Sequence, residues 1–141
     1  MRTFVLSVAA IAALGACAQP AAAPSQQALV ERGDYLVNSV VLCGDCHTPR
    51  LENMASDESR ALHGFEIGGP PTMATYAPAI AGIPANYTDE QFIAFLQTGV
   101  RPDGSHPRPP MPPYRLNDDD ARAVAAYIAT LPPAPASATA N

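Results

Sequence analysis

The sequence predicts an all-α fold in which three main helices are joined by long loops. Apolar residues recur at helical spacing in three segments, which begin near Gln26, Thr88 and Asp118. Between these segments lie most of the 16 prolines and 9 glycines of the chain. These residues favour turns and irregular connections over additional helices. A length of 141 residues is enough for one such domain.

The charge composition narrows the class of function. All eight basic residues are arginines, and thirteen Asp and Glu residues give a net charge of −5. This balance argues against a surface for nucleic acid or for anionic membranes. It favours a soluble protein that docks on basic patches. Hydrophobic residues make up 48% of the chain, which suffices for a core but not for a membrane protein.

Residues 1–18 are predicted to form a secretory signal peptide. A basic start at Arg2 precedes the apolar run Phe4–Leu14, which is too short to span a bilayer comfortably. Ala16-Cys17-Ala18 fits cleavage by ordinary signal peptidase. Leu14-Gly15-Ala16-Cys17 resembles a bacterial lipobox, in which Cys17 becomes lipidated. We favour the lipobox, because it gives Cys17 a role and residues 19–27 follow as a flexible linker. Under either interpretation the mature chain is exported, which predicts a periplasmic location.

The first predicted helix runs from about Gln26 to Ser39 and opens a folded domain assigned to residues 28–133. Its apolar face comprises Leu29, Gly33, Leu36, Val37 and Val40. A mid-helix glycine costs about 1 kcal/mol relative to alanine. Gly33 therefore predicts that another helix crosses closely, and Tyr127 of the last helix is the expected contact. The alternative is a helix that breaks near Gly33.

The chemistry is expected at Cys43-Gly44-Asp45-Cys46-His47. Cys-x-x-Cys-His is the attachment signature of a covalently bound haem. Two thiols three positions apart lie on adjacent turns of a short helix, where each can form a thioether to one haem vinyl group. The following residue, His47, is then placed to be the proximal iron ligand.

Two other uses of the cysteine pair are weaker. A thiol–disulfide protein would normally present the pair in a βαβ context, which the sequence lacks, and would not require His47 to follow. A zinc site would need a second pair of ligands.

A polar segment and a proline turn follow the cysteine motif. Pro49 should stop the short helix, and residues 51–60 should form a solvent-facing loop. Gly68-Gly69-Pro70-Pro71 predicts a tight turn. A proximal histidine needs an acceptor for its free ring N–H, and the Pro70 carbonyl is the candidate. The alternative is an ordinary loop.

The second and third helices carry clear boundary signals. Thr88-Asp89-Glu90-Gln91 is a capping box, and Gly99 should end that helix, whose apolar stripe is Phe92, Phe95 and Leu96. The last helix should begin at Asn117 or Asp118 and end before Pro132-Pro133. Its expected inner face comprises Val124, Tyr127, Ile128 and Leu131. Residues 134–141 have no periodicity and predict a disordered tail.

Met111 is the candidate for the sixth iron ligand. It lies in Arg108-Pro109-Pro110-Met111-Pro112-Pro113-Tyr114, where the prolines stiffen the backbone before folding. A weak thioether–iron bond needs such support. The alternative is a methionine that packs on the haem face and leaves the iron open.

Four other residues could compete with Met111. Met54 lies in the polar loop soon after His47, and Met73 follows the proline turn, where it could simply pack. His63 and His106 are rival ligands, but a lone loop histidine is more often a surface residue.

Residues from about Gln27 to Pro133 resemble a class I monohaem cytochrome c domain, similar to those of cytochrome subunits in bacterial periplasmic and membrane-bound dehydrogenases. The specific parts are the Cys-x-x-Cys-His element and the late Met-Pro. The resemblance implies one covalent haem c, with thioethers at Cys43 and Cys46, His47 as proximal ligand and Met111 as distal ligand. The segments that carry it are Arg32–Asn38, Cys43–Arg50, Gly68-Gly69, Tyr76–Pro78, Thr88–Phe92, Gly99-Val100, Met111-Pro112 and Asp118–Tyr127.

The predicted function is electron transfer rather than catalysis, because no acid, base or nucleophile is required. Ligation by His and Met favours a relatively high potential. The expected partners are redox proteins, such as a dehydrogenase, a terminal oxidase or another cytochrome, met through small transient contacts. The alternative is a haem enzyme or gas-binding sensor with an open distal site.

Overall fold

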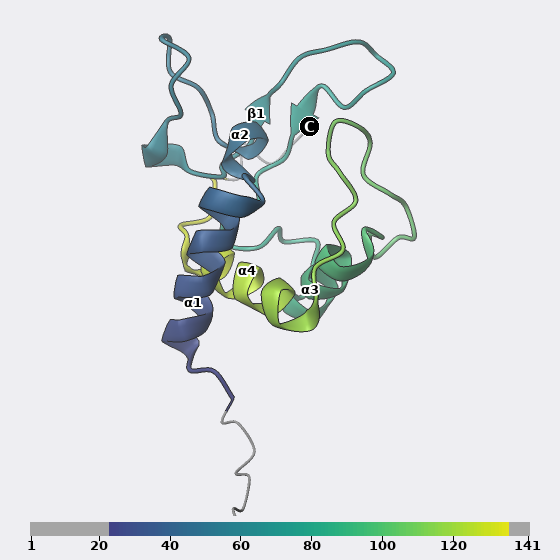
Figure 1. The fold of residues 1–141 in the computed structure, drawn as a ribbon. Helices are drawn as coiled ribbons and strands as arrows, with labels where there is room; N and C mark the ends of the chain where they lie inside the picture. Colours follow the sequence, from purple (N-terminus) through teal and green to yellow (C-terminus); the bar gives the residue numbers. More distant parts are fainter. Residues whose placement is uncertain (1–22, 136–141) are drawn as a thin grey trace, which may run out of the picture.

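The computed structural model describes residues 23–135 as a mostly helical domain (Figure 1). The predicted all-α class with three main helices is confirmed, and two strands of two residues each are added to it. Strands this short leave no alternating pattern in a sequence. In chain order the elements are α1 (Gln26–Tyr35), η1 (Leu36–Val40), α2 (Gly44–His47), η2 (Glu58–Arg60), β1 (Phe65–Glu66), β2 (Tyr76–Ala77), α3 (Asp89–Thr98) and α4 (Asp118–Thr130).

The ends of the chain bear on three of the predictions. The predicted signal peptide with Cys17, and most of the predicted tail, lie outside the described residues. The predicted end of the linker at residue 27 is too late, because the Ser25 side chain accepts a hydrogen bond from the Ala28 N–H and α1 already begins at Gln26. Within residues 23–135, no helix is long and apolar enough to cross a membrane.

The first and last helices cross at Gly33, as predicted. A Cβ atom at this position would lie 2.6 Å from the Cβ of Tyr127 and closer still to the carbonyl oxygen of Ala123. Only glycine allows this approach of α1 to α4. Hydrogen bonds at the rim of the crossing join Arg32 to Asp120 at 2.9 Å and Asn38 to the Tyr127 hydroxyl at 3.0 Å.

The end of the first helix differs from the regular helix that was predicted. Residues Leu36–Val40 form a π-helical turn, in which the Val41 N–H donates to the Leu36 carbonyl at 2.7 Å. The wider turn shifts the side chains that follow. Val40, predicted to face inward, is 52% exposed, whereas Val41 packs against the core.

The core is formed mainly by side chains of η1, α3 and α4. Its most deeply buried large side chains are Val37, Val124 and Ile128. α3 begins with the predicted capping box at Thr88 and Gln91, and ends at Gly99, which has a φ of 70°. α4 begins at Asn117, whose side chain accepts from the Asp120 N–H. Both helices therefore start and stop where local signals predicted.

The aromatic part of the core belongs mainly to α3. The Tyr87 and Phe92 rings meet edge to face with centroids 5.8 Å apart, and Phe95 lies 6.5 Å from Phe92. Such pairs are stable arrangements of aromatic quadrupoles. They place a broad apolar surface under the loops that follow.

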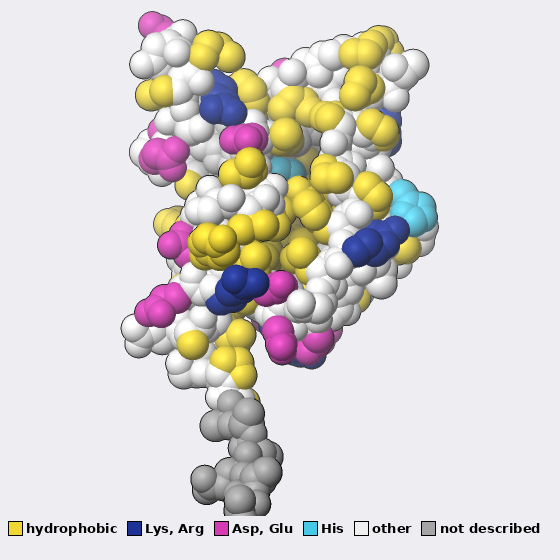
Figure 2. Space-filling view, in the orientation of Figure 1, with side chains coloured by type: hydrophobic (Ala, Val, Ile, Leu, Met, Phe, Trp, Pro, Cys, Tyr) yellow, Lys and Arg dark blue, Asp and Glu magenta, His cyan; other side chains and the backbone are white. Residues whose placement is uncertain are grey.

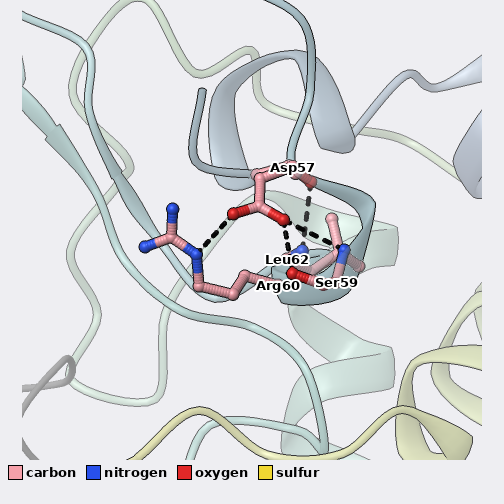
Figure 3. Close-up of polar contacts among 5 residues, drawn as sticks. Asp57, Ser59, Arg60 and Leu62 are labelled. Carbon is pink, nitrogen blue, oxygen red and sulfur yellow. Dashed lines mark hydrogen bonds and ion pairs between the residues drawn. The ribbon is translucent and has the colours of Figure 1, made fainter. Parts of the chain in front are cut away.

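The loop after α2 contains a polar turn at residues 57–60 (Figure 3). The Asp57 carboxylate accepts from the Ser59 N–H at 3.1 Å, from the Ser59 hydroxyl at 2.5 Å and from Arg60 Nε at 2.7 Å. These hydrogen bonds, those of Ser59 first, hold the pKa of Asp57 below its usual value. The turn leads to buried Leu62, whose N–H donates to Thr48 Oγ1 at 3.0 Å.

Candidate functional site

The Cys-x-x-Cys-His segment folds as the predicted short helix. The chain leaves η1 through Leu42, which has a φ of 57°. The Cys43 N–H then donates to the Val37 carbonyl at 3.1 Å, and the His47 N–H donates to the Cys43 carbonyl at 3.0 Å. One helical turn therefore carries both thiols and the histidine. Cys43 and Cys46 are half-buried and not joined to each other, and His47 is buried.

A large pocket opens beside α2. It has about 990 Å³ of empty space, a volume that includes open solvent at its mouth. Hydrophobic side chains gather around this hollow (Figure 2). Its walls come from α2, from residues 74–80, from α3 and α4, and from the strap, which we define as residues 100–116 between α3 and α4. The lining includes Cys43, Cys46, His47, Tyr76, Phe92, Phe95, Leu96, Arg101, Arg108, Met111, Tyr114, Val124 and Ile128.

The orientation of His47 is set by a backbone carbonyl. Its Nδ1 lies 2.7 Å from the oxygen of Pro78. A carbonyl can only accept, so Nδ1 carries the proton and Nε2 keeps its lone pair. The prediction that the Pro70 carbonyl is the acceptor is wrong. The Gly69-Pro70 turn is exposed, whereas the segment after β2 passes close to His47 because Gly64 lets two backbones approach.

Burial also sets the protonation of His47. Desolvation lowers the pKa of His47, and the hydrogen bond to Pro78 opposes this in part. The ring is therefore neutral at neutral pH. A neutral imidazole with a fixed tautomer and one free lone pair is the form that ligates a metal.

The Cys43 thiol does not have the environment of a reactive thiolate. Burial raises the pKa of Cys43 to about 11. A catalytic or redox-active cysteine normally has a lowered pKa, so this site disfavours the thiol–disulfide alternative. Within residues 23–135, no group of three or more His, Cys, Asp and Glu side chains could hold a metal ion. The described residues therefore offer no cluster for the zinc alternative.

Met111 reaches the same pocket from the strap, which lies across from α2 in Figure 1. The Met111 N–H donates to the Arg108 carbonyl at 3.2 Å. Arg108 Nη2 donates to the carbonyls of Pro71 and Met73 at 2.7 and 2.8 Å. The Ala74 N–H donates to the Pro109 carbonyl at 2.7 Å. The strap is thus tied to the loop that precedes β2, in addition to being stiffened by its prolines.

The rival residues lie elsewhere. Met54 is 69% exposed in the loop after α2. Met73 is half-buried, and neither methionine lines the pocket. His63 donates to the Pro132 carbonyl across 3.0 Å, and His106 to the Gly99 carbonyl across 3.1 Å. Neither histidine is among the residues that line the pocket.

Three of the lining residues that were not singled out from the sequence carry polar groups. Arg101 and Arg108 are the cations of the pocket wall, and Tyr114 donates from its hydroxyl to the Val41 carbonyl at 3.2 Å. Burial raises the pKa of Tyr114 to about 12. A sequence signal existed for Arg108 and Tyr114, because each lies three residues from Met111.

The donor set fits a haem attached at one edge. Two thiols on one helical turn, an imidazole with a free lone pair and a thioether share one mostly apolar pocket. Imidazole and thioether are axial ligands of c-type haem iron, and apolar walls suit a flat macrocycle. Fold and site together therefore define a small helical protein that binds haem covalently.

The family comparison agrees with this class. The cytochrome c family model matches residues 30–132, and the chain belongs to the cytochrome c family. Membership confirms the predicted cytochrome c fold and implies haem c and electron transfer.

Curated relatives are cytochrome proteins as well. A cytochrome c subunit of quinone alcohol dehydrogenase from Gluconacetobacter polyoxogenes is 34% identical over 127 residues, which cover 82% of this chain and 27% of that protein. A dihaem c-type cytochrome from Cereibacter sphaeroides is 34% identical over 72% of this chain and 35% of its own length. A fructose dehydrogenase cytochrome subunit from Gluconobacter japonicus is 31% identical over 72% of this chain and 22% of its own length.

The predicted resemblance to dehydrogenase cytochrome subunits is thus confirmed. The chain spans only about a quarter to a third of the length of these relatives. The similarity therefore concerns one domain of each.

Proposed function

We propose that this domain holds one haem c through Cys43, Cys46, His47 and Met111 and carries single electrons between redox proteins. One observation supports this most: residues from α2 and from the strap, about 65 positions apart in the sequence, line the same apolar pocket. When bound, a haem c with His and Met ligands supplies reversible one-electron chemistry at a relatively high potential.

Each of these residues has a separate role in holding the haem. Cys43 and Cys46 supply thioethers at one edge. His47 offers Nε2 as a ligand, because Nδ1–H is bound to Pro78. Met111 offers its sulfur from the strap, which the Arg108 hydrogen bonds hold in place. Phe92, Phe95 and the neighbouring apolar side chains exclude water, which favours a fixed ligand set over exchange with solvent.

We propose a dehydrogenase as electron donor, with a terminal oxidase or another cytochrome as acceptor. The names of the alcohol and fructose dehydrogenase cytochrome subunits support this choice. We place the protein in the periplasm, with lipidated Cys17 as an anchor, on the basis of its N-terminal sequence. Thioether attachment to haem is expected on that side of the membrane.

The haem and its ligands can be tested on the exported protein. A pyridine haemochrome spectrum, together with the intact mass, reports haem number, thioether attachment and any lipid on Cys17. One haem with two thioethers is expected. The reduced protein should bind carbon monoxide slowly at neutral pH, because Met111 occupies the sixth position. Rapid binding would support the open-site alternative, and free thiols at Cys43 and Cys46 without haem absorption would refute the proposed function.

A further inference from the structure

The arginines of this protein fall into two groups, those that form ion pairs with carboxylates and those that do not. Within the part of the chain that the structure describes, the three ion pairs use Arg32, Arg60 and Arg122. Four described arginines take part in none of them. Arg50 lies outside the strap and donates to Ser56 and to the Asp45 carbonyl. The other three, Arg101, Arg108 and Arg115, belong to the strap, which forms one wall of the pocket and carries Met111.

The strap therefore differs in charge from the rest of the molecule. It contains three arginines and one carboxylate, Asp103, for a net charge of +2, whereas the rest of the chain carries −7. In Figure 2 acidic side chains gather on the left and at the bottom of the view, where basic side chains lie among them, whereas the right rim of the hollow shows basic and histidine side chains without acidic ones beside them.

The hydrogen bonds that position these guanidinium groups run to uncharged acceptors. Arg108 donates to two carbonyls, Arg115 Nη1 donates to the Tyr114 carbonyl at 2.7 Å, and Arg101 Nη1 donates to Ser105 Oγ and to the His106 carbonyl. All of these acceptors are uncharged. The Ser105 N–H donates to the Asp103 carboxylate at 2.9 Å, and Arg101 interacts electrostatically with the same carboxylate, so the charge of Arg101 is offset more than those of Arg108 and Arg115.

The surface of the strap has the composition of an interface. Arg108 and Arg115 are exposed, as are Pro110, Pro112 and Pro113. Arginine and apolar surface are typical of protein contacts, and proline-fixed backbone loses little conformational freedom when it is covered. The strap is also continuous with the pocket wall, so a partner seated on it lies next to the redox site.

We propose that the strap is the docking surface for a redox protein that presents carboxylates around its own electron-exchange site. This rests on the proposed electron-transfer function and adds the chemistry of the partner. The overall charge of −5 would repel such a partner. The unpaired arginines reverse the local field and steer the partner to one wall of the pocket.

The test compares small redox reagents of opposite charge. Hexacyanoferrate(III), a trianion, and tris(phenanthroline)cobalt(III), a trication, each take one electron from the reduced protein and are themselves reduced. With the wild type, the oxidation rate with the anion should fall as ionic strength rises, although the net charge predicts the opposite. The rate with the cation should not show this fall.

Charge-matched variants locate the effect. Arg115→Gln removes a strap charge without touching the pocket lining and should slow oxidation by hexacyanoferrate about threefold at low ionic strength. Arg101→Gln should also slow oxidation by hexacyanoferrate, after the rate has been corrected for any change in the midpoint potential of the variant. Arg122→Gln removes the same charge from α4, where Arg122 is paired with Asp118, and should change the rate little.

Four outcomes would overturn the proposal. Equal effects of Arg115→Gln and Arg122→Gln would show that only net charge matters. A wild-type rate with the anion that rises with salt would exclude a positive docking surface. Binding to phosphatidylglycerol vesicles that depends on Arg115 would reassign the strap to a membrane. Failure of both reagents to oxidise the protein would overturn the proposed function as well, and so differs from the other three.

Discussion

His47 Nδ1 lies 2.7 Å from the carbonyl oxygen of Pro78, 31 residues further along the chain. Gly64 allows the backbone segments on either side of this contact to come close together. Its N–H donates to the His47 carbonyl at 2.7 Å, and a Cβ atom on it would lie 2.6 Å from the Tyr76 hydroxyl and 2.8 Å from the Ala79 nitrogen. The backbones of three segments therefore meet around His47.

Gly64→Ala should separate these segments. It should destabilise the protein by about 1–3 kcal/mol through overpacking, in addition to the strain of a φ of +87°. A weaker hydrogen bond to Pro78 makes the imidazole a poorer electron donor, so the midpoint potential should rise. Urea unfolding and a redox titration measure the two effects.

Gly104→Ala is the matched control. Gly104 has a φ of +82°, but an added Cβ would have no atom within 4 Å. This variant should lose stability through backbone strain alone, and its midpoint potential should not change. Equal shifts in potential for both variants would contradict a role for the close approach at Gly64.

Gly33→Ala should weaken the crossing of α1 and α4. The new methyl group would collide with the Tyr127 Cβ and the Ala123 carbonyl. Overpacking should cost about 1–3 kcal/mol or more, which exceeds the gain of about 1 kcal/mol in helix propensity. A lower urea midpoint is expected in equilibrium unfolding. An unchanged or higher midpoint would show that the helices can move apart at little cost.

Met111→Ala should leave the haem attached and open the sixth coordination position. Thioether sulfur stabilises reduced iron, so its loss should lower the potential and allow rapid binding of carbon monoxide. Absorption spectra of both oxidation states report the change. Met54→Ala, at a side chain that is 69% exposed, should leave spectrum and potential as they are. An unchanged spectrum of Met111→Ala would refute the assignment.

Arg108→Gln should loosen the strap that carries Met111. It removes two hydrogen bonds from a charged donor to the carbonyls of Pro71 and Met73. Hydrogen bonds from a charged donor contribute about 1.5–3 kcal/mol. Because Arg108 is exposed, its replacement should weaken the attachment of the strap by only about 1 kcal/mol. External imidazole should then displace Met111 about fivefold more readily in a spectroscopic titration.

Arg122→Gln provides the comparison for that titration. It removes an equal charge from α4, where Arg122 pairs with Asp118, and should not alter imidazole binding. Equal increases for the two variants would indicate a general electrostatic effect instead of a tether at Arg108.

Asp57→Asn should make stability depend less on pH. The pKa of Asp57 is held below its usual value by Ser59 and then by Arg60. A lowered pKa gives a stabilisation that is present above the usual value of about 3.9 and is lost as pH falls through the folded-state pKa. The variant should therefore melt slightly lower than wild type at pH 7, and the difference should vanish in acid. A Tm difference that is constant with pH would contradict this account.

Local signals were enough to predict much of the fold. The capping box at Thr88 and Gln91, the stop at Gly99 and the start of α4 at Asn117 depend on hydrogen bonds within a few residues. The same holds for the spacing that carries both thiols and His47 on one turn. Met111 could be proposed because its prolines stiffen the backbone before any tertiary contact forms.

Several features depended on segments that are far apart in the sequence. The acceptor for His47 was predicted eight residues too early, at Pro70 and not at Pro78, because no local pattern shows which carbonyl will approach a distant ring. Val40 was predicted to face the core for a similar reason. A regular helical period does not reveal the π-helical turn, which directs Val41 toward the core in its place.

The sequence by itself determined the class of this protein, the helices and the residues offered to a haem, because these follow from spacing and local hydrogen bonds. The tertiary structure decided how the site is completed. It brought the Pro78 carbonyl to His47, tied the strap to the loop before β2 through Arg108, and left the strap arginines outside the ion pairs of residues 23–135. A net charge of −5 predicted docking on basic patches, but the charge that a partner meets depends on which side chains pair, and pairing is set by the fold.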